Sequence, residues 1–590
     1  MQNSLDFYKT QLESHQSKSR DLFKTLSLYS ILRLLVFVLT GIGIYFTFKQ
    51  WQTTLAIGVL GVAIFLFLLS KYTDLKLERQ RYKRLVKINE EEIAIASGNF
   101  HERADGSEFQ NPKHFYSLDI DLFGIGSFFQ FTNRTNIKEG TQRFADSLLA
   151  NKITNIPKRQ EAIKELAEQP EWYQNYWAIA QGVEVEHSAK KIIKWLKDYK
   201  PFLSTTWFYI TIVFSILSLV IAGLAITEII PVGFLGYWLL LGLGITVKFL
   251  KKINELAQHS SKTKKTFRQY ALLLNQIETK IFSSELLQEQ QQKVQLEGQK
   301  ASAIFAKFSN HIDILDNRNN LISAIFGNGY FLSDIRQTYY IEKWIITYAN
   351  KVEDWFEVVT FFDTYNSFGN YAFNHQQFTY PIITSEAHTF LASELGHPLL
   401  QEDKRIDSDL ELKNQQFFIV TGANMAGKST FLRTVALHIV MSNVGLPVCA
   451  KRSKYKPIKL VTSMRTTDSL TDDSSYFFSE LTRLKFIVDT IELDDSYFII
   501  LDEILKGTNS TDKAIGSRKF VEKLVKLNAT GIIATHDLSL TEIESQLEAV
   551  KNYYFDAQIV NDELYFDYKL KQGVCQNMNA SFLLKKMDIV

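Results

Sequence analysis

The chain is poor in residues that mark several common classes of protein. It has 2 cysteines and 9 prolines in 590 residues, and its 66 basic and 64 acidic side chains leave a net charge of +2. Cys449 and Cys575 cannot build a disulfide framework or a four-thiolate zinc site, so we expect reduced core thiols. The low proline content and 13% aromatic residues argue against a collagen-like or disordered chain. The charge balance gives no overall field for nucleic acid, so any basic surface is local.

The length predicts three or four domains, and the apolar residues gather in four runs although the mean hydropathy is −0.08. The runs are Tyr29–Phe48, Thr54–Ser70, Trp207–Ile226 and Ile230–Val247. Each is close to the ~20 residues with which a helix crosses a ~30 Å hydrocarbon core. They predict two transmembrane hairpins, 29–70 and 207–247. Buried soluble helices are the alternative, which two adjacent pairs with so few polar residues disfavour.

Basic residues flank both predicted hairpins, whereas the hairpin tips carry only Lys49 and Glu228. By the positive-inside rule, both hairpins leave the cytoplasm and return to it. The predicted location is therefore the inner (plasma) membrane, multi-pass, with everything else in the cytoplasm. Five lysines precede the second hairpin: Lys190, Lys191, Lys194, Lys197 and Lys200. They could contact DNA phosphates, but anionic lipid is favoured because a spanning helix follows directly.

The strongest local signal is a glycine-rich loop between a predicted strand and a predicted helix. The apolar strand Phe417–Thr421 runs into GANMAGKST. G-x-x-x-x-G-K-S in this context is typical of a phosphate-binding loop, and a glycine-rich turn is the weaker alternative. Backbone N–H groups would bind the phosphates of ATP, Lys428 would reach the β- and γ-phosphates, and Ser429 would ligate Mg²⁺. The predicted phosphate contacts are Gly422, Ala423, Asn424, Met425, Ala426, Gly427, Lys428, Ser429 and Thr430.

Two further predicted strands end in residues that complete such a site. The strand Tyr497–Leu501 ends at Asp502, which would hold Mg²⁺ through water, and Glu503, which would orient or deprotonate the attacking water. The strand Thr530–Ala534 is followed by His536, which can sense the γ-phosphate; capping a helix is the alternative role. Central parallel strands open on the ligand at their carboxyl ends. The sequence therefore predicts an Mg²⁺-dependent ATPase with Glu503 and His536 as catalytic residues.

These segments together resemble the MutS family of ABC-type ATPases. GANMAGKSTFLR is similar to the family's phosphate loop, FIILDEILKGTNSTD to its Walker B strand and the following loop, and IIATHD to its histidine switch. MRTTDSLTDDSSYFFSELTRLKFI resembles the segment that reaches across a dimer, which implies a homodimer in which Ser475 contacts the partner's nucleotide. Asp473 stands where glycine is expected, and its charge would weaken or reshape that contact. Ala423 and Ala426 replace a usual proline and glycine without removing a needed N–H or hydroxyl.

The resemblance extends towards the N-terminus. The segment Leu118–Leu166, with Gly126-Ser127 and Asn133-Arg134-Thr135, is similar to the helical core of MutS proteins. The family's mismatch-reading N-terminal domain, which wedges a phenylalanine beside a glutamate into the duplex, has no counterpart. Phe100-His101-Glu102 copies that spacing, but too little chain surrounds it to build such a domain, so we treat it as a coincidence. The second hairpin falls where a DNA-repair relative would have the tips of its clamp helices.

The predicted architecture is an α/β ABC-type P-loop ATPase domain on a mostly α-helical MutS-like core, with four transmembrane helices in two hairpins. The predicted divisions are a cytoplasmic segment 1–28, hairpin 29–70, first core part 71–206, hairpin 207–247, second core part or lever 248–385, and ATPase domain 386–590. The resemblance implies a membrane-anchored ATPase that uses ATP and Mg²⁺ as a dimer, with membrane lipid and double-stranded DNA as partners in mismatch repair or recombination. The alternative is an ATP-driven membrane machine that no longer binds DNA.

Overall fold

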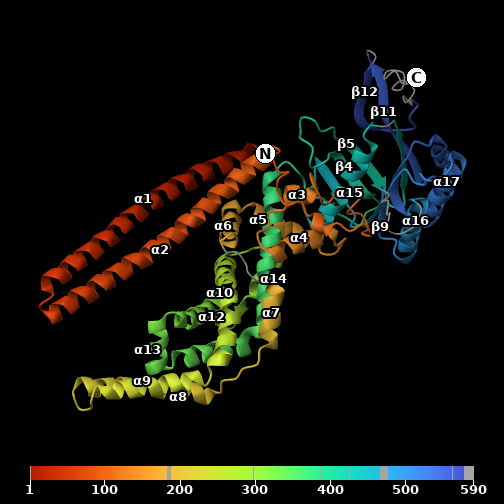
Figure 1. Ribbon diagram of the computed structural model, residues 1–590. Coiled ribbons are helices and arrows are strands. Elements are labelled where there is room, and N and C mark those ends of the chain that lie inside the picture. The colour runs from red at the N-terminus through yellow and green to blue at the C-terminus, as the bar shows by residue number, and fades with distance from the viewer. Residues whose placement is uncertain are drawn as a thin grey trace.

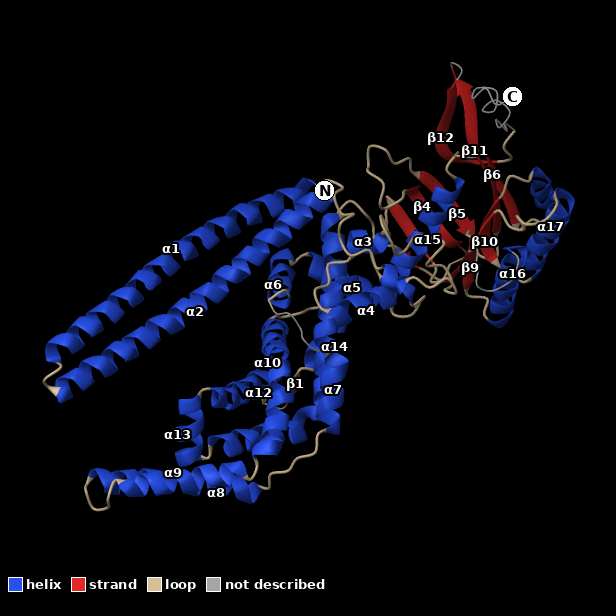
Figure 2. Ribbon diagram, in the orientation of Figure 1, coloured by secondary structure: helices blue, strands red, loops and turns tan. Residues whose placement is uncertain are grey.

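The computed structural model describes residues 2–182, 188–296, 298–386, 388–423, 425–465, 476–560 and 563–576. Figure 1 shows three parts that follow one another along the chain: a long helical hairpin at the N-terminus, a helical body that carries a second hairpin, and a C-terminal body. Figure 2 shows that the large sheets belong to the C-terminal body. This division places the predicted nucleotide site far along the chain from both apolar hairpins.

The N-terminal hairpin consists of α1 (Gln2–Thr47) and α2 (Trp51–Ala96), of 46 residues each. A Cβ at Gly61 would lie 2.2 Å from Thr40 Oγ1, so this glycine lets the two helices approach closely. The predicted apolar runs form the outer part of the hairpin, where large side chains such as Phe37 are exposed. Both helices extend beyond the apolar runs as polar helix and enter the helical body. Hydropathy marks only the part of a helix with apolar surroundings, so it did not predict where these helices begin and end.

The second hairpin consists of α8 (Thr205–Ile226) and α9 (Gly233–Val247). Among the described residues, α1, α2 and α8 are each long and apolar enough to cross a membrane. Helix α9 has 15 residues and meets this test only together with α10 (Leu250–Thr279), from which a 67° bend separates it. Three of the four predicted runs thus lie in helices that could span alone, and the fourth could do so only as a bent pair.

The helical body is built on α14 (Ser333–Asn374), a 42-residue helix whose second half is buried almost all round. There, the Asp363 carboxylate accepts hydrogen bonds from the backbone N–H groups of Asn136 and Ile137, each at 3.0 Å. Burial raises the pKa of Asp363 to about 7 against the effect of these bonds. The body's other helices are α3 (Phe128–Thr132), α4 (Lys138–Leu149), α5 (Ile156–Ala167), α6 (Pro170–Ala180), α7 (Ala189–Asp198), α11 (Glu285–Gln292), α12 (Ala301–Asp316) and α13 (Leu321–Phe331). A short ribbon of β1 (Gln295–Leu296) and β2 (Gln299–Lys300) completes it.

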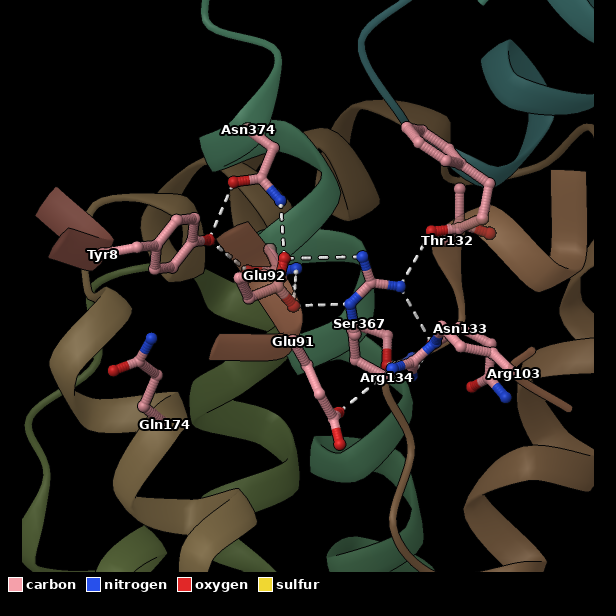
Figure 3. A network of polar contacts seen from close by, with 12 residues as sticks. Tyr8, Glu91, Glu92, Arg103, Thr132, Asn133, Arg134, Gln174, Ser367 and Asn374 are labelled. Atoms are coloured by element: carbon pink, nitrogen blue, oxygen red, sulfur yellow. Dashed lines mark hydrogen bonds and ion pairs between the residues drawn. The ribbon is translucent and has the colours of Figure 1, made fainter. Parts of the chain in front are cut away.

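A buried polar network joins the root of the first hairpin to the helical body (Figure 3). The Arg134 guanidinium donates to the Glu92 carboxylate of α2 at 2.5 Å, and the two side chains are only 6% and 2% exposed. The amides of Asn370 and Asn374, both on α14, donate to the same carboxylate at 3.2 Å. The Tyr8 hydroxyl of α1 donates to the oxygens of both amides. The network thus joins α1, α2 and α14 to the loop that contains Arg134.

The C-terminal body contains a six-stranded sheet and a four-stranded sheet. The larger one has the order β12-β11-β6-β10-β9-β8, in which β12 alone runs antiparallel to its neighbour. Its strands are β6 (Phe417–Gly422), β8 (Lys459–Ser463), β9 (Tyr497–Asp502), β10 (Thr530–Ala534), β11 (Val550–Val560) and β12 (Glu563–Gln572). The smaller sheet has the order β3-β7-β4-β5 and consists of β3 (Ile382–Ile383), β4 (His388–Leu395), β5 (Ser408–Lys413) and β7 (Arg452–Tyr455). Helices α15 (Lys428–Val444), α16 (Tyr476–Leu493) and α17 (Ser510–Lys526) belong to this body. The three strands predicted from the sequence are confirmed as β6, β9 and β10.

Candidate active site

The order of the central strands brings the predicted site residues to one edge of the sheet. Strand β10 lies between β6 and β9, and its last residue, Ala534, pairs with Val420 of β6 and Asp502 of β9. All three strands are parallel, so the segments that follow them leave the sheet at the same edge. The runs Phe417–Val420, Phe498–Leu501 and Gly531–Ala534 are buried throughout, as expected of central parallel strands that are covered on both faces.

The loop after β6 curls tightly before α15 begins. Gly422 and Gly427 have φ values of 150° and 102°, and Met425 has 66°. A Cβ at Gly422 would lie 2.7 Å from the carbonyl oxygen of Phe555, so β11 leaves no room for a side chain there. Gly427 is the N-cap of α15, which directs the positive end of the helix dipole towards the loop. Asn424 lies outside the described residues, and the rest of the predicted loop has the geometry of an anion cradle.

The Lys428 ammonium lies over this loop. It is 6% exposed and donates to the carbonyl oxygens of Gly422 and Ala423 at 2.8 and 2.9 Å. Burial lowers the pKa of Lys428, while the carboxylates of Glu503 and Asp502 act in the opposite direction. The ammonium can bind a phosphate oxygen, whereas the two carboxylates beside it require a cation such as Mg²⁺ between them and the phosphate.

The other predicted side chains form two close pairs next to the lysine. The Ser429 hydroxyl donates to Asp502 Oδ2 at 2.7 Å. His536 Nε2 lies 2.7 Å from Glu503 Oε1 and 3.3 Å from Lys428 Nζ. The structure thus brings together the predicted Mg²⁺ ligands and, beside them, the predicted general base and phosphate sensor.

Glu503 sits in a strained and strongly charged position. Its φ of 50° lies in the left-handed region, and its N–H donates to the carbonyl oxygen of Ala534 at 2.9 Å. The hydrogen bond from His536 lowers the pKa of Glu503 to about 2; burial opposes this shift, and the charges of Lys506 and Lys513 add to it. Glu503 is therefore a carboxylate at neutral pH. Non-glycine residues held in this backbone region are concentrated at functional sites.

A cavity of about 480 Å³ opens beside the loop. Site residues form one wall, and His397, Phe555 and Tyr568 belong to the others. Burial, with the nearby Arg433 charge, lowers the pKa of His397 to about 4, so this ring is neutral at pH 7. The cradle, the buried ammonium and the Ser429–Asp502 pair provide the donor set that a nucleoside triphosphate with Mg²⁺ requires. The apolar and aromatic walls can take its base.

Tyr568 and Phe555 belong to no sequence motif, so the sequence analysis did not identify them. Tyr568 comes from β12, and its Cδ1 atom would lie 3.1 Å from a Cβ at Gly427. Phe555 comes from β11, which pairs with β6. Both reach the cavity through the pairing order of the sheet, which no local motif encodes.

A buried carboxylate connects helix α16 to the loop that follows Glu503. Glu480, 3% exposed, accepts from the backbone N–H groups of Leu505 and Lys506 at 2.6 and 3.0 Å. Leu505 has a φ of 61°, so the loop turns sharply at this point. Ser475 and Asp473, which precede α16, lie outside the described residues, and the predicted contact across a dimer stays a prediction.

The helical core is anchored to the same body by two acidic residues. Asp119 accepts from Thr462 Oγ1 and from the N–H of Arg465, and Asp121 pairs with Arg433 and Arg465. These contacts connect the core segment directly to β8, to α15 and to the chain after β8.

Phe100, the phenylalanine of the Phe-x-Glu spacing, lies in the packed interior. Phe100 is only 9% exposed, and its ring lies 5.2 Å from that of Phe131. Phe100 packs in the core, where it cannot act as a wedge in a duplex.

Comparison with known proteins yields matches in the C-terminal part of the chain. Residues 418–585 match the family model described as MutS domain V. The chain is 32% identical to "MutS protein homolog 4" of Homo sapiens over 31% of this chain and 20% of that protein. It is 31% identical to "DNA mismatch repair protein MutS" of Methanococcoides burtonii over 34% of this chain and 23% of that protein. It is 32% identical to the protein of the same name from Acetivibrio thermocellus over 29% of this chain and 20% of that protein. The chain thus spans about a fifth to a quarter of the length of these relatives.

Proposed function

Because the chain belongs to the MutS family through its domain V, we propose that it is a membrane-anchored ATPase with an ABC-type P-loop domain. The observation that carries the proposal is the convergence of five predicted side chains at one sheet edge. Ser429 pairs with Asp502 and His536 with Glu503, each at 2.7 Å, and Lys428 lies 3.3 Å from His536. A phosphate cradle, a pair of magnesium ligands and a carboxylate next to a histidine are the parts that ATP hydrolysis needs.

Each side chain has a separate task in this reaction. The loop N–H groups and Lys428 would bind the β- and γ-phosphates, and Ser429 and Asp502 would hold Mg²⁺. Bound Mg²⁺ neutralises charge on the phosphate oxygens. The Glu503 carboxylate accepts a hydrogen bond from the attacking water and so orients it towards the γ-phosphate.

His536 connects the state of the nucleotide to the strength of the base. Its Nε2 atom lies next to both Glu503 and Lys428, so a γ-phosphate beside Lys428 competes with Glu503 for the same ring nitrogen. A histidine that turns to the phosphate releases Glu503, whose pKa then rises from about 2 towards its ordinary value. The released carboxylate is a better base at the moment when substrate is in place.

The resemblance to MutS proteins supports a homodimer with composite sites. Ser475 directly precedes α16, and Glu480 in that helix holds the loop after Glu503. A contact between Ser475 and the partner's nucleotide would therefore act on the position of Glu503 through one rigid helix. This connection supports hydrolysis that depends on closure of the dimer.

The apolar hairpins support an anchor in the inner (plasma) membrane, with the ATPase domain in the cytoplasm. Their outer side chains are exposed, for example Phe37 by 70% and Leu219 by 63%, and basic residues flank both hairpins. Contiguous apolar surface of this extent is stable only in contact with lipid or another apolar partner.

Two functions are considered for the ATP cycle. The names of the bacterial and archaeal relatives and the MutS-like core favour action on double-stranded DNA, in mismatch repair or recombination. The apolar hairpin α8–α9 at the far end of the helical body favours a membrane machine that no longer binds DNA. We give the first function precedence because Asp119 and Asp121 connect the core to the ATPase body, as a DNA-responsive clamp requires.

The test is the ATPase rate of the full chain in lipid nanodiscs, with and without matched and mismatched duplex. Glu503→Gln should lower turnover at least ~10²-fold, the usual contribution of a general base. Glu492→Gln, on the surface of α16 and paired with Lys523 at 3.1 Å, is the matched control and should leave the rate unchanged. If Glu503→Gln turns over like Glu492→Gln, the ATPase proposal is wrong. A duplex effect that fades steeply with salt supports DNA binding, whereas no response at low salt favours the membrane machine.

A further inference from the structure

Helix α13 (Leu321–Phe331) is an apolar helix that the sequence analysis did not identify. Its eleven residues, LISAIFGNGYF, contain no charged side chain. Leu321, Ile322 and Phe326 are exposed by 73%, 69% and 52%, although a helix of this kind normally buries such residues. It is too short to span a bilayer. Its outer face therefore needs an apolar partner that the described part of the chain does not supply.

The C-terminal end of α13 is hydrogen-bonded to the middle of α8 in the second hairpin. The Ser218 and Ser215 hydroxyls of α8 donate to the carbonyl oxygens of Tyr330 and Phe331 at 2.6 and 3.3 Å. These serines lie 10 and 13 residues from the start of α8, or about 15–20 Å along it at 1.5 Å per residue. Figure 1 shows α13 beside α9, well away from the C-terminal body. Where the hairpin enters a membrane, α13 enters with it.

The contact between α13 and α9 has the features of helix packing in lipid. A Cβ at Gly242 of α9 would lie 2.2 Å from the carbonyl oxygen of Gly329, and one at Gly329 would lie 2.6 Å from Leu239 Cγ. The two backbones therefore touch through a pair of glycines. Small residues that let backbones touch are typical of interfaces between membrane helices, where packing replaces the hydrophobic effect.

Both ends of α13 have protein partners for their backbone groups. The Asn320 side chain accepts from the N–H groups of Ile322 and Ser323. At the other end, the N–H of Leu332 bonds back to the carbonyl oxygens of Gly327 and Asn328, and Ser215 and Ser218 donate to the last two carbonyl groups. Helix ends in water can rely on solvent, whereas those in hydrocarbon need such partners.

An ion pair joins the residues on either side of α13. Arg318, before α13, lies 3.4 Å from Asp334, just after it, and their side chains are 13% and 6% exposed. Arg318 also donates to Asn254 of α10 at 2.6 Å. The charges on either side of α13 are thus paired with each other and shielded, and the residues between them present an uncharged surface.

From these contacts we propose that α13 is a third membrane element, whose outer face, formed by Leu321, Ile322 and Phe326, lies against the acyl chains of the bilayer. This inference rests on the proposed insertion of the α8–α9 hairpin, because α13 shares its depth. The occupant is lipid because α13 packs against α8 and α9, which themselves expose large apolar side chains such as Leu219 and Leu240, by 63% and 64%. The long helix α14 follows α13 directly and would therefore begin in the membrane.

The test uses single cysteines with an environment-sensitive fluorophore in the full chain, reconstituted into phosphatidylcholine–phosphatidylglycerol vesicles with or without doxyl-labelled acyl chains. Both native cysteines, Cys449 and Cys575, are buried. Ile322→Cys reports on α13, Leu219→Cys on the hairpin, and Leu493→Cys, on α16 and 89% exposed, is the control away from lipid. Phe326→Cys repeats the α13 measurement at a second position. Labels on α13 should be quenched as strongly as that on Leu219→Cys, and severalfold more than that on Leu493→Cys.

The other outcomes separate this inference from the proposed function. Quenching at Leu219→Cys without quenching at either α13 position would overturn the inference and leave the membrane anchor intact. Blue-shifted but unquenched emission from both α13 positions would mean that protein covers this face, which also overturns it. Absence of quenching at Leu219→Cys as well as at both α13 positions would refute the insertion of the α8–α9 hairpin, and the inference would fall with it.

Discussion

Removing Arg134 should loosen the root of the first hairpin, because Glu92 would lose its charged partner while staying buried. The two side chains are 6% and 2% exposed, and the guanidinium lies 2.5 Å from the carboxylate (Figure 3). In Arg134→Met, the carboxylate keeps only the two amide donors, Asn370 and Asn374, at 3.2 Å. Breaking a buried ion pair in this way costs about 3–5 kcal/mol.

Hydrogen exchange measured by mass spectrometry on the full chain in nanodiscs is the assay, because it locates the loss of protection along the chain. Each 1.4 kcal/mol corresponds to a factor of ten, so 3–5 kcal/mol predicts exchange at least about a hundredfold faster. The effect should be confined to the end of α2, near Glu92, and to the end of α14, near Asn370 and Asn374. The site strands β6, β9 and β10 should keep their protection.

Two further variants test the reasoning behind this magnitude. Lys87→Met removes an exposed pair on α2, in which Lys87 lies 3.6 Å from Glu91 with side chains 71% and 40% exposed. Exposed pairs contribute less than about 1 kcal/mol, so exchange should change little. Adding Glu92→Gln to Arg134→Met removes the unpaired charge and should restore most of the protection. If Arg134→Met exchanges no faster than Lys87→Met, the ion pair does not stabilise this junction and the argument is refuted.

Three further predictions concern the site and the second hairpin. Lys428→Ala should abolish detectable binding of a fluorescent ATP analogue at concentrations that saturate the parent chain; retained affinity would show that the loop does not hold the phosphates. The pKa of Glu503 is lowered to about 2, so its stabilising effect is full above pH 4.5 and lost as pH falls towards 2. The melting temperature of Glu503→Gln should accordingly differ from the parent by a constant amount above pH 5, and the gap should close in acid; a gap that widens in acid would contradict this sign. Gly242→Ala should melt a few degrees lower, since overpacking costs about 1–3 kcal/mol, whereas Gly244→Ala, with open space at its Cβ, should not; equal melting would contradict the glycine contact.

The central strands could be read from the sequence because they are buried on both faces. The strand Thr530–Ala534 was predicted with the bounds of β10, and the predicted strand Phe417–Thr421 ends one residue short of β6. Continuous apolar runs that end in glycine, acid or histidine mark both the strand and the polar edge that follows it. The close grouping of Lys428, Asp502 and His536 follows from strand order, which the sequence suggested only through the spacing of its motifs.

Other features depend on contacts that no local pattern encodes. Glu92 and Arg134 are 42 residues apart and carry no motif, so their buried pairing could not be foreseen. Helix α13 was missed because its apolar run is about half of a membrane span. The ends of α1 and α2 were missed because apolar composition stops near Tyr29 and Ser70, while helix propensity and packing continue to Gln2 and Ala96.

Helix α14 connects the proposed membrane element α13 to the root of the first hairpin. It is continuous from Ser333, beside the Arg318–Asp334 pair, to Asn374, which donates to Glu92. Its 42 residues amount to about 60 Å of unbroken helix. If ATP bound in the C-terminal body alters how deeply the start of this strut sits in lipid, thermodynamic linkage demands the reverse as well. The affinity for ATP would then differ between an ordinary bilayer and a thinner or more curved one. The ratio of these two affinities would equal the factor by which ATP changes the preference of the chain for one bilayer over the other.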